Sequence, residues 1–358
     1  MTIREADRET VRRAVETGDP LPGTGGFAGE IDGMLVRDVL GRQPLFYEPE
    51  NGNWSSDRRT LKQPVSFPAG CIFGPDQETP SQRWKVPTVE PETNHDSAIE
   101  TLRQAIETAV GSIDTDGLAI AFSGGVDSAL LAAKLEVPLY TVGFPESHDL
   151  EAARTAADLL GMELREVILT HEDIEQAIPP VVEALGRTNA MDIQIALGLY
   201  FVGEQISADG FDRVALGQGA DELFGGYAKV ENAPDDHRVE AETVRGARRE
   251  VMDTLPDQLE RDVLTLRAAG VEPVTPLLHD AVVQAALALP DELLVNDQHR
   301  KVALRHAVRG WLPDELAFRG KKAMQYGTLI SRELDRLARQ AGYKRRMDNH
   351  IQKYIETW

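Results

Sequence analysis

The sequence predicts an α/β protein: a mostly parallel sheet flanked by helices, with a small β-rich N-terminal domain before it and a helical C-terminal part after it. Three observations predict this class. Helix-like and strand-like segments alternate from about residue 95 onward, which is typical of a parallel sheet. Two glycine-rich segments each directly follow a predicted strand. Before residue 87, short strand-like runs are separated by Gly, Pro and Asn, which indicates strands joined by turns.

The N-terminal domain is predicted from three short strands, at residues 34–40, 44–47 and 53–56. A polar, proline-bearing stretch from Pro87 to His95 follows them, and this composition is typical of a linker. The sequence therefore predicts three parts: a β-rich domain over residues 1–87, a sheet-containing domain over residues 95–330 and a helical tail over residues 331–358.

The larger domain is predicted to alternate helices and strands. Hydrophobic periodicity indicates helices at residues 96–110, 149–160, 174–185 and 192–207. Apolar runs bounded by turn residues indicate strands at residues 117–122, 139–144, 163–169 and 213–216. From about residue 237 the chain reads as helical with short breaks. Ligands of open parallel sheets bind beyond the carboxyl ends of the strands, so residues that follow these strands are candidate site residues.

Cysteine content and hydropathy exclude several classes of protein. Cys71 is the single cysteine among 358 residues, which excludes an internal disulfide, a Cys-x-x-Cys redox centre and a multi-cysteine metal site. We expect Cys71 to be a small apolar core residue. No apolar run approaches the roughly 20 residues that span a bilayer, and residues 1–5 are polar. We therefore expect a cytoplasmic protein that does not associate with membranes.

The charge balance is strongly acidic. The chain carries 38 basic and 59 acidic residues, a formal net charge of −21. Such a surface repels nucleic acid and anionic lipid, so we expect neither as a partner. Most of the basic residues are arginine, as in proteins that work in concentrated salt, where screening reduces self-repulsion. Adaptation to high salt and an ordinary acidic protein both stay open.

The first glycine-rich segment is Ser123-Gly124-Gly125-Val126-Asp127-Ser128, between a predicted strand and a helix-like run. Two glycines let the backbone approach a ligand closely, and N–H groups at the start of a helix favour an oxyanion. The segment therefore predicts a phosphate-binding turn. It lacks the Gly-Lys-Ser/Thr ending of a Walker loop and the spacing of a dinucleotide fingerprint.

The second glycine-rich segment is Gly217-Gln218-Gly219-Ala220-Asp221-Glu222-Leu223-Phe224-Gly225-Gly226-Tyr227. The first segment resembles the phosphate turn of the PP-loop ATP pyrophosphatases, an adenine nucleotide α hydrolase-like fold. The two segments in this order resemble the synthetase domain of asparagine synthetases. The resemblance covers about residues 95–330 and extends to residues 141–144, 149–150, 270–272, 276–278, Lys301, Arg305 and 319–321.

This resemblance implies an enzyme, an AMP-forming carbon–nitrogen ligase. In that family a carboxylate attacks the α-phosphorus of ATP to give an acyl-adenylate and pyrophosphate, and ammonia or an amine then displaces AMP. The best-known reaction makes asparagine, so we expect aspartate as the acid. Such a site gathers Mg²⁺ and cations around the phosphates, and Mg²⁺ prefers one or two carboxylates plus phosphate oxygens and water.

The resemblance also implies the site residues. Mg²⁺ would be held by Asp127 and Asp221. The catalytic residues would be Asp127, Gln218 and Lys321, with Lys321 reaching the phosphates and the developing charge. The remaining contacts to ATP and pyrophosphate would come from Phe122, Ser123, Gly124, Gly125, Asp127, Ser128, Val142, Gly143, Asp149 and Gly217.

Three departures from the family pattern bear on the chemistry. Gln218 stands where asparagine synthetases have a glutamate, and an amide cannot act as a general base. Leu216 replaces the serine of the same motif. Residues 274–279 replace the family segment Arg-Val-Pro-Phe-Leu-Asp, so its arginine and aspartate become Val274 and His279. For His279, a ligand-facing role and a structural role are both open.

The N-terminal domain resembles a shortened glutaminase domain. Residues 36–47, Val-Arg-Asp-Val-Leu-Gly-Arg-Gln-Pro-Leu-Phe-Tyr, are similar to the family segment Ala-Arg-Asp-Arg-Leu-Gly-x-x-Pro-Leu-Tyr-Tyr. Complete relatives begin with a nucleophilic cysteine, whereas this chain begins Met1-Thr2, and Thr2 lacks the neighbouring glycines that such a nucleophile requires. We therefore expect no glutamine hydrolysis, and free ammonia or an amine as the nucleophile.

Other functions stay open. A different acceptor, as in ring closure by β-lactam synthetase relatives, would keep adenylation, and those relatives also depart from glutamate at the position of Gln218. The same residue supports a nucleotide-binding regulator without turnover. A tRNA-modifying enzyme is disfavoured, because cysteine pairs and a basic surface are missing. We expect small-molecule substrates and, by analogy with two-domain relatives, a homodimer.

Overall fold

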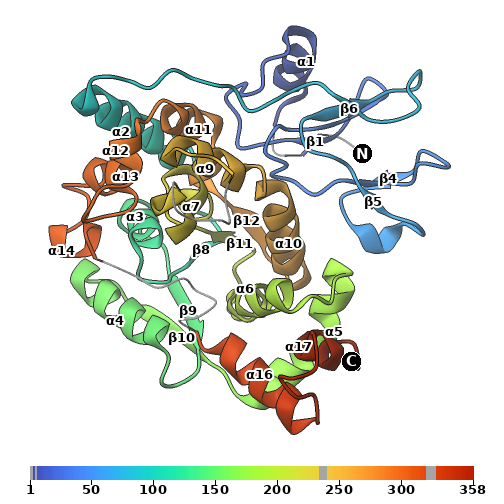
Figure 1. Cartoon of the computed structure of the whole chain (residues 1–358), viewed down its shortest axis with the longest axis vertical. Coiled ribbons are helices and arrows are strands. Elements are labelled where there is room, and N and C mark those ends of the chain that lie inside the picture. The colour runs from blue at the N-terminus through green and yellow to red at the C-terminus, as the bar shows by residue number, and fades with distance from the viewer. Residues whose placement is uncertain (1–2, 5, 234–239, 320–327) are drawn as a thin grey trace. The chain divides into compact units, whose positions relative to one another are not determined.

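A computed structural model describes residues 3–4, 6–233, 240–319 and 328–358 of the chain (Figure 1). By their internal contacts these residues form two compact units. The first unit comprises Met1–Ile113, Gly217–Glu260 and Thr275–Arg309, and the second comprises Asp114–Leu216, Arg261–Val274 and Gly310–Trp358. The units follow contacts in space, and the division into domains at residues 87, 95 and 330 stays a prediction.

The second unit contains the predicted parallel sheet. Its five described strands pair in the order β10–β9–β8–β11–β12, and every pairing is parallel. They are β8 (Leu118–Ala121), β9 (Leu139–Gly143), β10 (Leu164–Ile168), β11 (Arg213–Ala215) and β12 (Glu272–Val274). Together with the helices around the sheet, this confirms the predicted fold class.

The helices of the second unit follow the predicted positions closely. They are α3 (Val126–Leu135), α4 (His148–Leu160), α5 (His171–Leu185), α6 (Ala190–Ala208), α14 (Asp314–Ala317), α16 (Ile330–Gln340) and α17 (His350–Ile355). Helix α10 (Leu255–Ala268) begins in the first unit and ends in the second. Helix α5 starts three residues before its predicted start, because Thr170 and Asp173 form a reciprocal capping box there.

The order of the strands reverses at β8. From β8 the chain moves to β9 and β10 on one side, and it returns to β11 on the other side. Right-handed crossovers therefore place α3 and α4 on one face of the sheet and α5 and α6 on the opposite face, and Figure 1 shows α4 and α6 on either side of β9 and β10. The carboxyl ends of β8 and β11 are neighbours, since Ala215 pairs with Ile120. Such a switch point is where open α/β sheets bind ligands.

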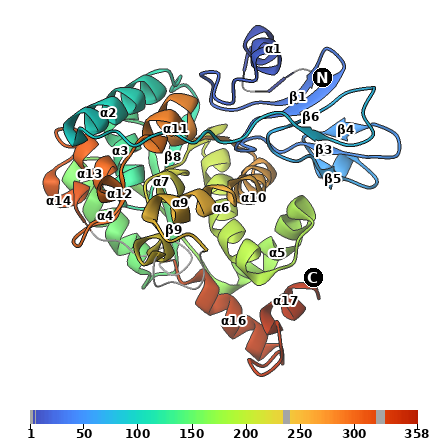
Figure 2. The same ribbon diagram turned by 45° about the horizontal axis from the view of Figure 1, so that its top comes forward.

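The apolar helix α6 organises the C-terminal part of the second unit. Its buried side chains include Ile193, Leu197 and Ile206, and it contacts the sheet as well as α5, α16 and α17. Figure 2 shows α16 and α17 close to α5. In the described part of the chain, no helix is both long and apolar enough to cross a bilayer.

Two small antiparallel sheets form the β-rich part of the first unit. One has the order β1 (Ala28–Ile31), β2 (Met34–Arg37), β6 (Cys71–Phe73) and β7 (Ser81–Gln82), and the other has the order β4 (Trp54–Ser55), β3 (Phe46–Tyr47) and β5 (Val65–Ser66). Their shared core includes Leu45, Phe67 and Cys71, which are all buried. Cys71 is therefore the apolar core residue that we expected, and its burial raises the pKa of the thiol.

Helices complete the first unit. They are α1 (Arg8–Thr17), η1 (Arg58–Thr60), α2 (His95–Gly111), α7 (Ala220–Leu223), α8 (Ala228–Glu231), α9 (Val244–Met252), η3 (Pro276–Leu278), α11 (Asp280–Leu287), α12 (Asp291–Leu294) and α13 (Val302–Ala307). Helix α2 packs against α11, α13 and η3, which follow it by more than 150 residues.

Several short elements differ from the prediction, and α1 and β12 show why. Helix α1 lies in a stretch for which only strands are predicted. Asp7 caps this helix by accepting hydrogen bonds from the N–H groups of Glu9 and Thr10, and Val11 and Ala14 are buried. Strand β12 lies in a stretch that was read as helical. It is only three residues long and contains Pro273, which a strand tolerates at the edge of a sheet.

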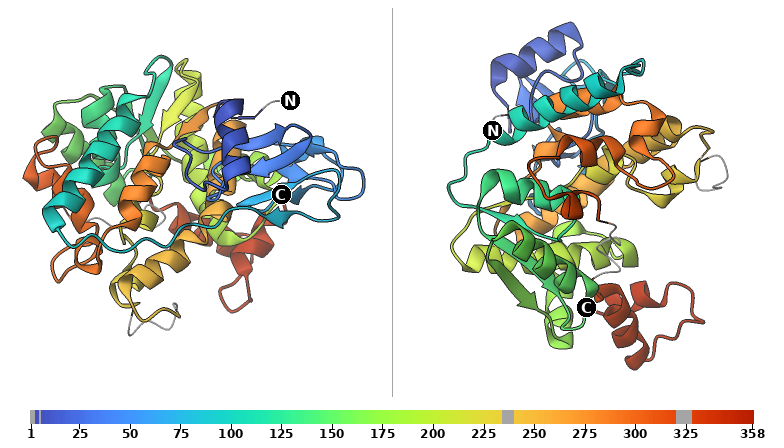
Figure 3. Two further views of the ribbon diagram at one scale, coloured as in Figure 1. Left: turned by 90° about the horizontal axis from the view of Figure 1, so that it is seen from above. Right: turned by 90° about the vertical axis from the view of Figure 1, so that its left-hand side faces the viewer.

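The predicted linker is an extended chain, as the left view of Figure 3 shows between β7 and α2. Side chains of α9 hold it in place. Arg249 donates to the carbonyl oxygens of Val86 and Pro87, and Arg245 donates to that of Val89 at 2.5 Å. These contacts make residues 86–89 part of the packed unit rather than a free tether.

Candidate functional site

The first glycine-rich turn lies between β8 and α3, as predicted. Gly124 has a φ of +69°, a conformation that favours glycine, and a Cβ at this position would lie 2.5 Å from the carbonyl oxygen of Ala152. Gly125 is the N-cap of α3. Because glycine has no side chain, nothing at this position covers the N–H groups that start the helix. The turn therefore needs glycine at position 124 and directs backbone donors outward from the helix end.

Two serines make this turn rigid. The backbone N–H of Ser123 donates to Oγ of Ser128 at 3.2 Å, and the two hydroxyl oxygens are also 3.2 Å apart. The Ser128 hydroxyl donates to the carbonyl oxygen of Gly125 at 3.3 Å and is buried. Asp127 lies in the first turn of α3, where a carboxylate interacts favourably with the helix dipole.

The end of the neighbouring strand β9 contributes the next predicted residues. Val142 and Gly143 are its last two residues, and both are buried. A Cβ at Gly143 would overlap Oγ of Ser147, which caps α4 by accepting from the N–H of Leu150 at 3.3 Å. Asp149 lies in the first turn of α4 and is also buried. The close packing of strand and helix fixes the backbone at this end of β9.

Arg319, one of the residues that resemble the family, comes to the first turn. Its Nη1 lies 3.3 Å from the carbonyl oxygen of Ala152, the atom against which Gly124 packs. The predicted catalytic residue Lys321 lies outside the described residues, as does Thr2.

The second glycine-rich segment, in the first unit, forms a turn and the short helix α7. Gly219 has a φ of +93°, and a Cβ there would lie 2.5 Å from Cδ2 of Leu278. Gly225 has a φ of +72°, and a Cβ at Gly226 would overlap the carboxylate of Asp221. The glycines are thus required by backbone conformation and by the space that neighbouring side chains occupy.

Asp221 faces a lysine that is distant in sequence. Its Oδ1 lies 2.9 Å from Nζ of Lys301, and the side chains are 48% and 9% exposed, respectively. Lys301 has a φ of +59° at the start of α13, a backbone that costs a residue other than glycine about 1 kcal/mol. The resemblance included Lys301 but gave it no role, and 80 residues of chain separate the pair, so no local pattern could have predicted it.

Glu222, beside Asp221, is buried. Its Oε1 accepts a hydrogen bond from the hydroxyl of Tyr227 at 2.6 Å. Burial and then the neighbouring charge of Asp221 raise the pKa of Glu222 to about 7, and the Tyr227 hydrogen bond opposes this increase. The second turn therefore carries a carboxyl group that changes its charge near neutral pH.

The structure gives His279 a structural contact. Its Nδ1 accepts from the N–H of Ala281 at 3.2 Å, so His279 is the N-cap of α11. Burial lowers the pKa of His279, which agrees with a ring nitrogen that must stay unprotonated to accept. Gln218 is partly buried in the turn before α7, as its motif predicts.

A comparison with models of known protein families identifies the family of this chain. The model of the asparagine synthase family matches residues 100–250 and 231–355, most of the chain. The chain belongs to the asparagine synthase family. This confirms the resemblance on which the site residues were predicted, while their roles stay predictions.

Individual relatives of this family member agree. It is 29% identical to a putative glutamine-hydrolysing asparagine synthetase of Methanocaldococcus jannaschii over 88% of this chain and 70% of the relative. It is 27% identical to glutamine-hydrolysing asparagine synthetase B of Escherichia coli over 86% of this chain and 62% of the relative. The human enzyme is 33% identical over 57% of this chain and 38% of the relative. The chain thus spans only part of the length of these relatives.

The carboxylates predicted to hold Mg²⁺ lie in different units, Asp221 in the first and Asp127 in the second, and the metal site stays a prediction for this asparagine synthase family member. Asp221 presents a half-exposed carboxylate that already accepts a cation, the ammonium of Lys301. Asp127 presents a second carboxylate at the phosphate-type turn. Hard oxygen donors that leave room for water and phosphate oxygens are what Mg²⁺ prefers.

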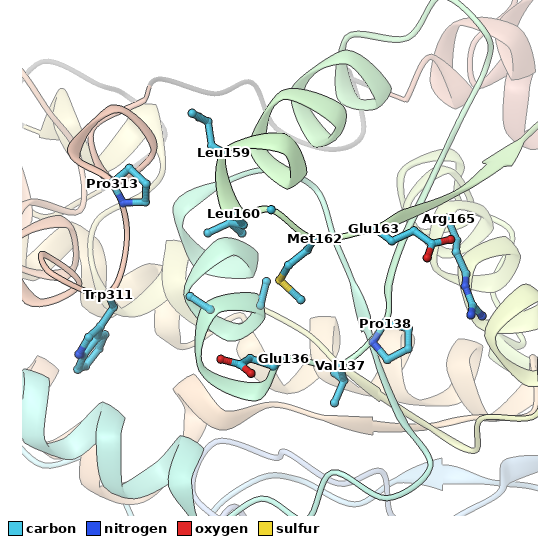
Figure 4. Close-up of a pocket in the computed structure, with 13 residues that line it drawn as sticks. Glu136, Val137, Pro138, Leu159, Leu160, Met162, Glu163, Arg165, Trp311 and Pro313 are labelled. Atoms are coloured by element: carbon cyan, nitrogen blue, oxygen red, sulfur yellow. The ribbon is translucent and has the colours of Figure 1, made fainter.

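A cavity of about 700 Å³ in the second unit lies away from the first glycine-rich turn (Figure 4). Its lining includes Glu136, Val137 and Pro138, just before β9, and Met162 and Glu163, just before β10. It is therefore at the amino ends of the parallel strands, whereas the first glycine-rich turn follows a carboxyl end. We do not assign the nucleotide to this cavity.

Proposed function

We propose that the chain is an ATP-dependent, AMP-forming ligase that adenylates a carboxylic acid, with aspartate as the first candidate, and transfers the acyl group to ammonia or an amine. One observation carries most of the weight. Strands β8 and β11, whose ends lead into the two glycine-rich turns, are neighbours at the switch point of the sheet in a member of the asparagine synthase family.

The proposed reaction has two displacement steps. First, a carboxylate oxygen of the acid attacks the α-phosphorus of ATP, the bond from that phosphorus to the oxygen bridging to the β-phosphorus breaks, and pyrophosphate leaves. The N–H groups of residues 124–126 would hold the pyrophosphate. Second, the amine nitrogen attacks the acyl carbon and loses a proton, and AMP leaves.

Charge neutralisation is the main task of such a site. Asp127 and Asp221 would hold Mg²⁺, which, when bound, neutralises phosphate charge. Lys301 forms an ion pair with the Asp221 carboxylate in the structure. Lys321 would add a positive charge at the adenylate, on the pattern of its family.

ATP–pyrophosphate exchange tests the proposal. Labelled pyrophosphate should enter ATP only in the presence of the correct acid, so a panel that begins with aspartate identifies the substrate. Omission of the acid is the control. Nucleotide binding without exchange for every acid would instead support a regulator without turnover.

Gln218 favours a second candidate, a ligase with a different acceptor, because the family's glutamate is absent. The variant Gln218→Glu separates the two. If ammonia-dependent asparagine formation only lacks a base, this variant should increase amide formation at least about tenfold, since a positioned base contributes roughly 10²–10⁴-fold. Gln218→Asn, which restores no base, is the control. Unchanged product formation in both would show that the pocket works without a base at this position.

A further inference from the structure

A buried arginine joins the β-rich segment of the first unit to residues beside the second glycine-rich turn. Arg42 is 2% exposed, and its nitrogens donate to four acceptors, one of which is the carbonyl oxygen of Thr24 at 3.4 Å. Nε donates to Oδ1 of Asp38 at 2.8 Å, Nη2 to Oδ1 of Asp280 at 2.7 Å, and Nη1 to the carbonyl oxygen of Leu278 at 2.8 Å. Asp38 and Asp280 are buried as well.

Asp280 strengthens the same junction. Its Oδ2 accepts from the backbone N–H groups of Gly23 and Thr24, at 3.0 and 2.8 Å, and lies 3.2 Å from the hydroxyl of Thr24. The N–H of Asp280 in turn donates to the carbonyl oxygen of Thr24 at 2.9 Å. A buried charged network of this kind resists displacement, because removal of one member leaves the others desolvated and unpaired.

Leu278 carries the connection to the second turn. Its backbone oxygen is held by Arg42, and its side chain occupies the space where Gly219 would have a Cβ, with 2.5 Å between that position and Cδ2. Gly219 is the N-cap of α7, the helix that contains Asp221. A shift of Leu278 would therefore press on the turn or leave it unsupported.

We infer that residues 1–87 brace the second glycine-rich turn through Arg42, and that Arg42 is a positioning residue for the site. The inference rests on the proposed adenylation for its effect on activity, but not for its effect on structure. Position 42 is variable in the family segment that this chain resembles, so the resemblance does not supply this role.

Hydrogen–deuterium exchange on the full chain tests the structural part. In Arg42→Met, the amides of Leu223 and Phe224, which donate to Gly219 and Ala220, should exchange at least about tenfold faster, because their turn loses its support. Amides of α3 should keep the wild-type rate. Arg42→Lys keeps the charge but cannot reach three acceptors at once, so it should give a smaller increase, and it serves if Arg42→Met does not fold.

Glu48→Gln is the matched control. Glu48 is also buried, and it accepts from Asn51, Asn53 and the backbone N–H groups of Lys62 and Gln63, all within residues 1–87. It should lower the melting temperature without changing the Leu223 and Phe224 amides. Equal acceleration in Glu48→Gln and the Arg42 variants, or no acceleration in either, would overturn the inference.

Exchange kinetics add a second readout. Arg42→Met should lower kcat of ATP–pyrophosphate exchange about tenfold or more, with little change in the KM for ATP, because misplaced groups cost rate more than ground-state binding. Glu48→Gln should retain the wild-type kcat. If the wild-type protein catalyses no exchange with any acid, the proposed function fails, while the amide measurement still decides the role of Arg42.

Discussion

Asp127 and Asp221 are the residues with the most direct predicted effect on turnover. Each replacement by asparagine removes a negative charge and keeps the shape, so Mg²⁺ binding should suffer while the protein still folds. Asp221→Asn also removes the charged partner of Lys301, so its melting temperature should fall more than that of Asp127→Asn. We expect Asp127→Asn and Asp221→Asn each to lower ATP–pyrophosphate exchange by roughly two orders of magnitude or more. Exchange rates and melting temperatures are the measurements.

Exposed aspartates provide the controls for these two variants. Asp158→Asn in the second unit and Asp253→Asn in the first should retain the wild-type rate, since both positions are exposed helix-end residues. Near-normal exchange in Asp127→Asn or Asp221→Asn would move the metal site elsewhere.

Glu222 makes stability depend on pH. Its pKa is raised from 4.5 to about 7 by burial and by Asp221, so the folded state binds its proton more tightly than the unfolded state does. The protonated Glu222 therefore contributes fully to the free energy of unfolding below about pH 4.5. This contribution is lost as the pH rises to about 7. Glu222→Gln keeps an acceptor for Tyr227 and removes the titration. Between pH 4.5 and pH 8, the free energy of unfolding of this variant should increase by about 3 kcal/mol relative to that of the wild type.

Urea unfolding at several pH values measures this difference. The exposed Glu146→Gln should follow the wild-type curve. Parallel curves for wild type and Glu222→Gln would mean that Glu222 is ionised in both the folded and the unfolded protein.

At the scale of elements, a glycine pair isolates what the first turn requires. Gly124 and Gly161 have nearly the same φ, +69° and +67°, but only Gly124 has a neighbour, the Ala152 carbonyl, where a Cβ would go. In both alanine variants, backbone strain should lower the free energy of unfolding by about 1 kcal/mol. Gly124→Ala should lose more, and its affinity for ATP should fall at least about tenfold, because the turn must shift.

Calorimetric ATP titration and chemical unfolding of both variants check this prediction. Gly161→Ala should bind ATP as wild type does, since position 161 ends α4, at the opposite end of that helix from Asp149. Equal ATP affinity in Gly124→Ala and Gly161→Ala would place the nucleotide away from the turn between β8 and α3.

The element scale also shows where hydrophobic periodicity succeeds. The long helices and strands of the second unit fall within a few residues of their predicted bounds, because each buries a regular apolar pattern. Helix α1 was not predicted because its sequence signal is only a cap and two buried residues, Val11 and Ala14, in an otherwise charged segment. Strand β12 was not predicted because three residues are too few to show an alternation of apolar and polar side chains.

At the scale of the whole molecule, net charge should govern the response to salt. A charge of −21 destabilises the folded state by self-repulsion, and salt screens this repulsion. The melting temperature should therefore rise between 0.1 and 2 M KCl at pH 7. The same series near the sequence pI of about 4.8 is the control, where the rise should be smaller. An unchanged melting temperature in both series would exclude adaptation to salt.

The predicted homodimer and cytoplasmic location are also properties of the whole molecule, and they stay predictions. So does the absence of glutamine hydrolysis, because Thr2 lies outside the described residues. Sedimentation of the full chain and an ammonia-release assay with glutamine address the oligomeric state and the hydrolysis, respectively.

The family, the parallel sheet and both glycine-rich turns could be predicted from the amino-acid sequence alone. These features follow from local causes: apolar period, glycine at positive φ, and a strand followed directly by a helix. The sequence also placed Asp127, Gln218 and Asp221 in those turns.

The distant residues that support those turns become visible once the chain is folded. Asp221 pairs with Lys301, 80 residues away in the sequence. Leu278 accepts a hydrogen bond from Arg42, 236 residues away. A pairing of this kind depends on how helices and sheets pack, and packing depends on shape and burial summed over many residues. No short stretch of sequence contains that information, whereas each glycine turn is specified by the few residues that form it.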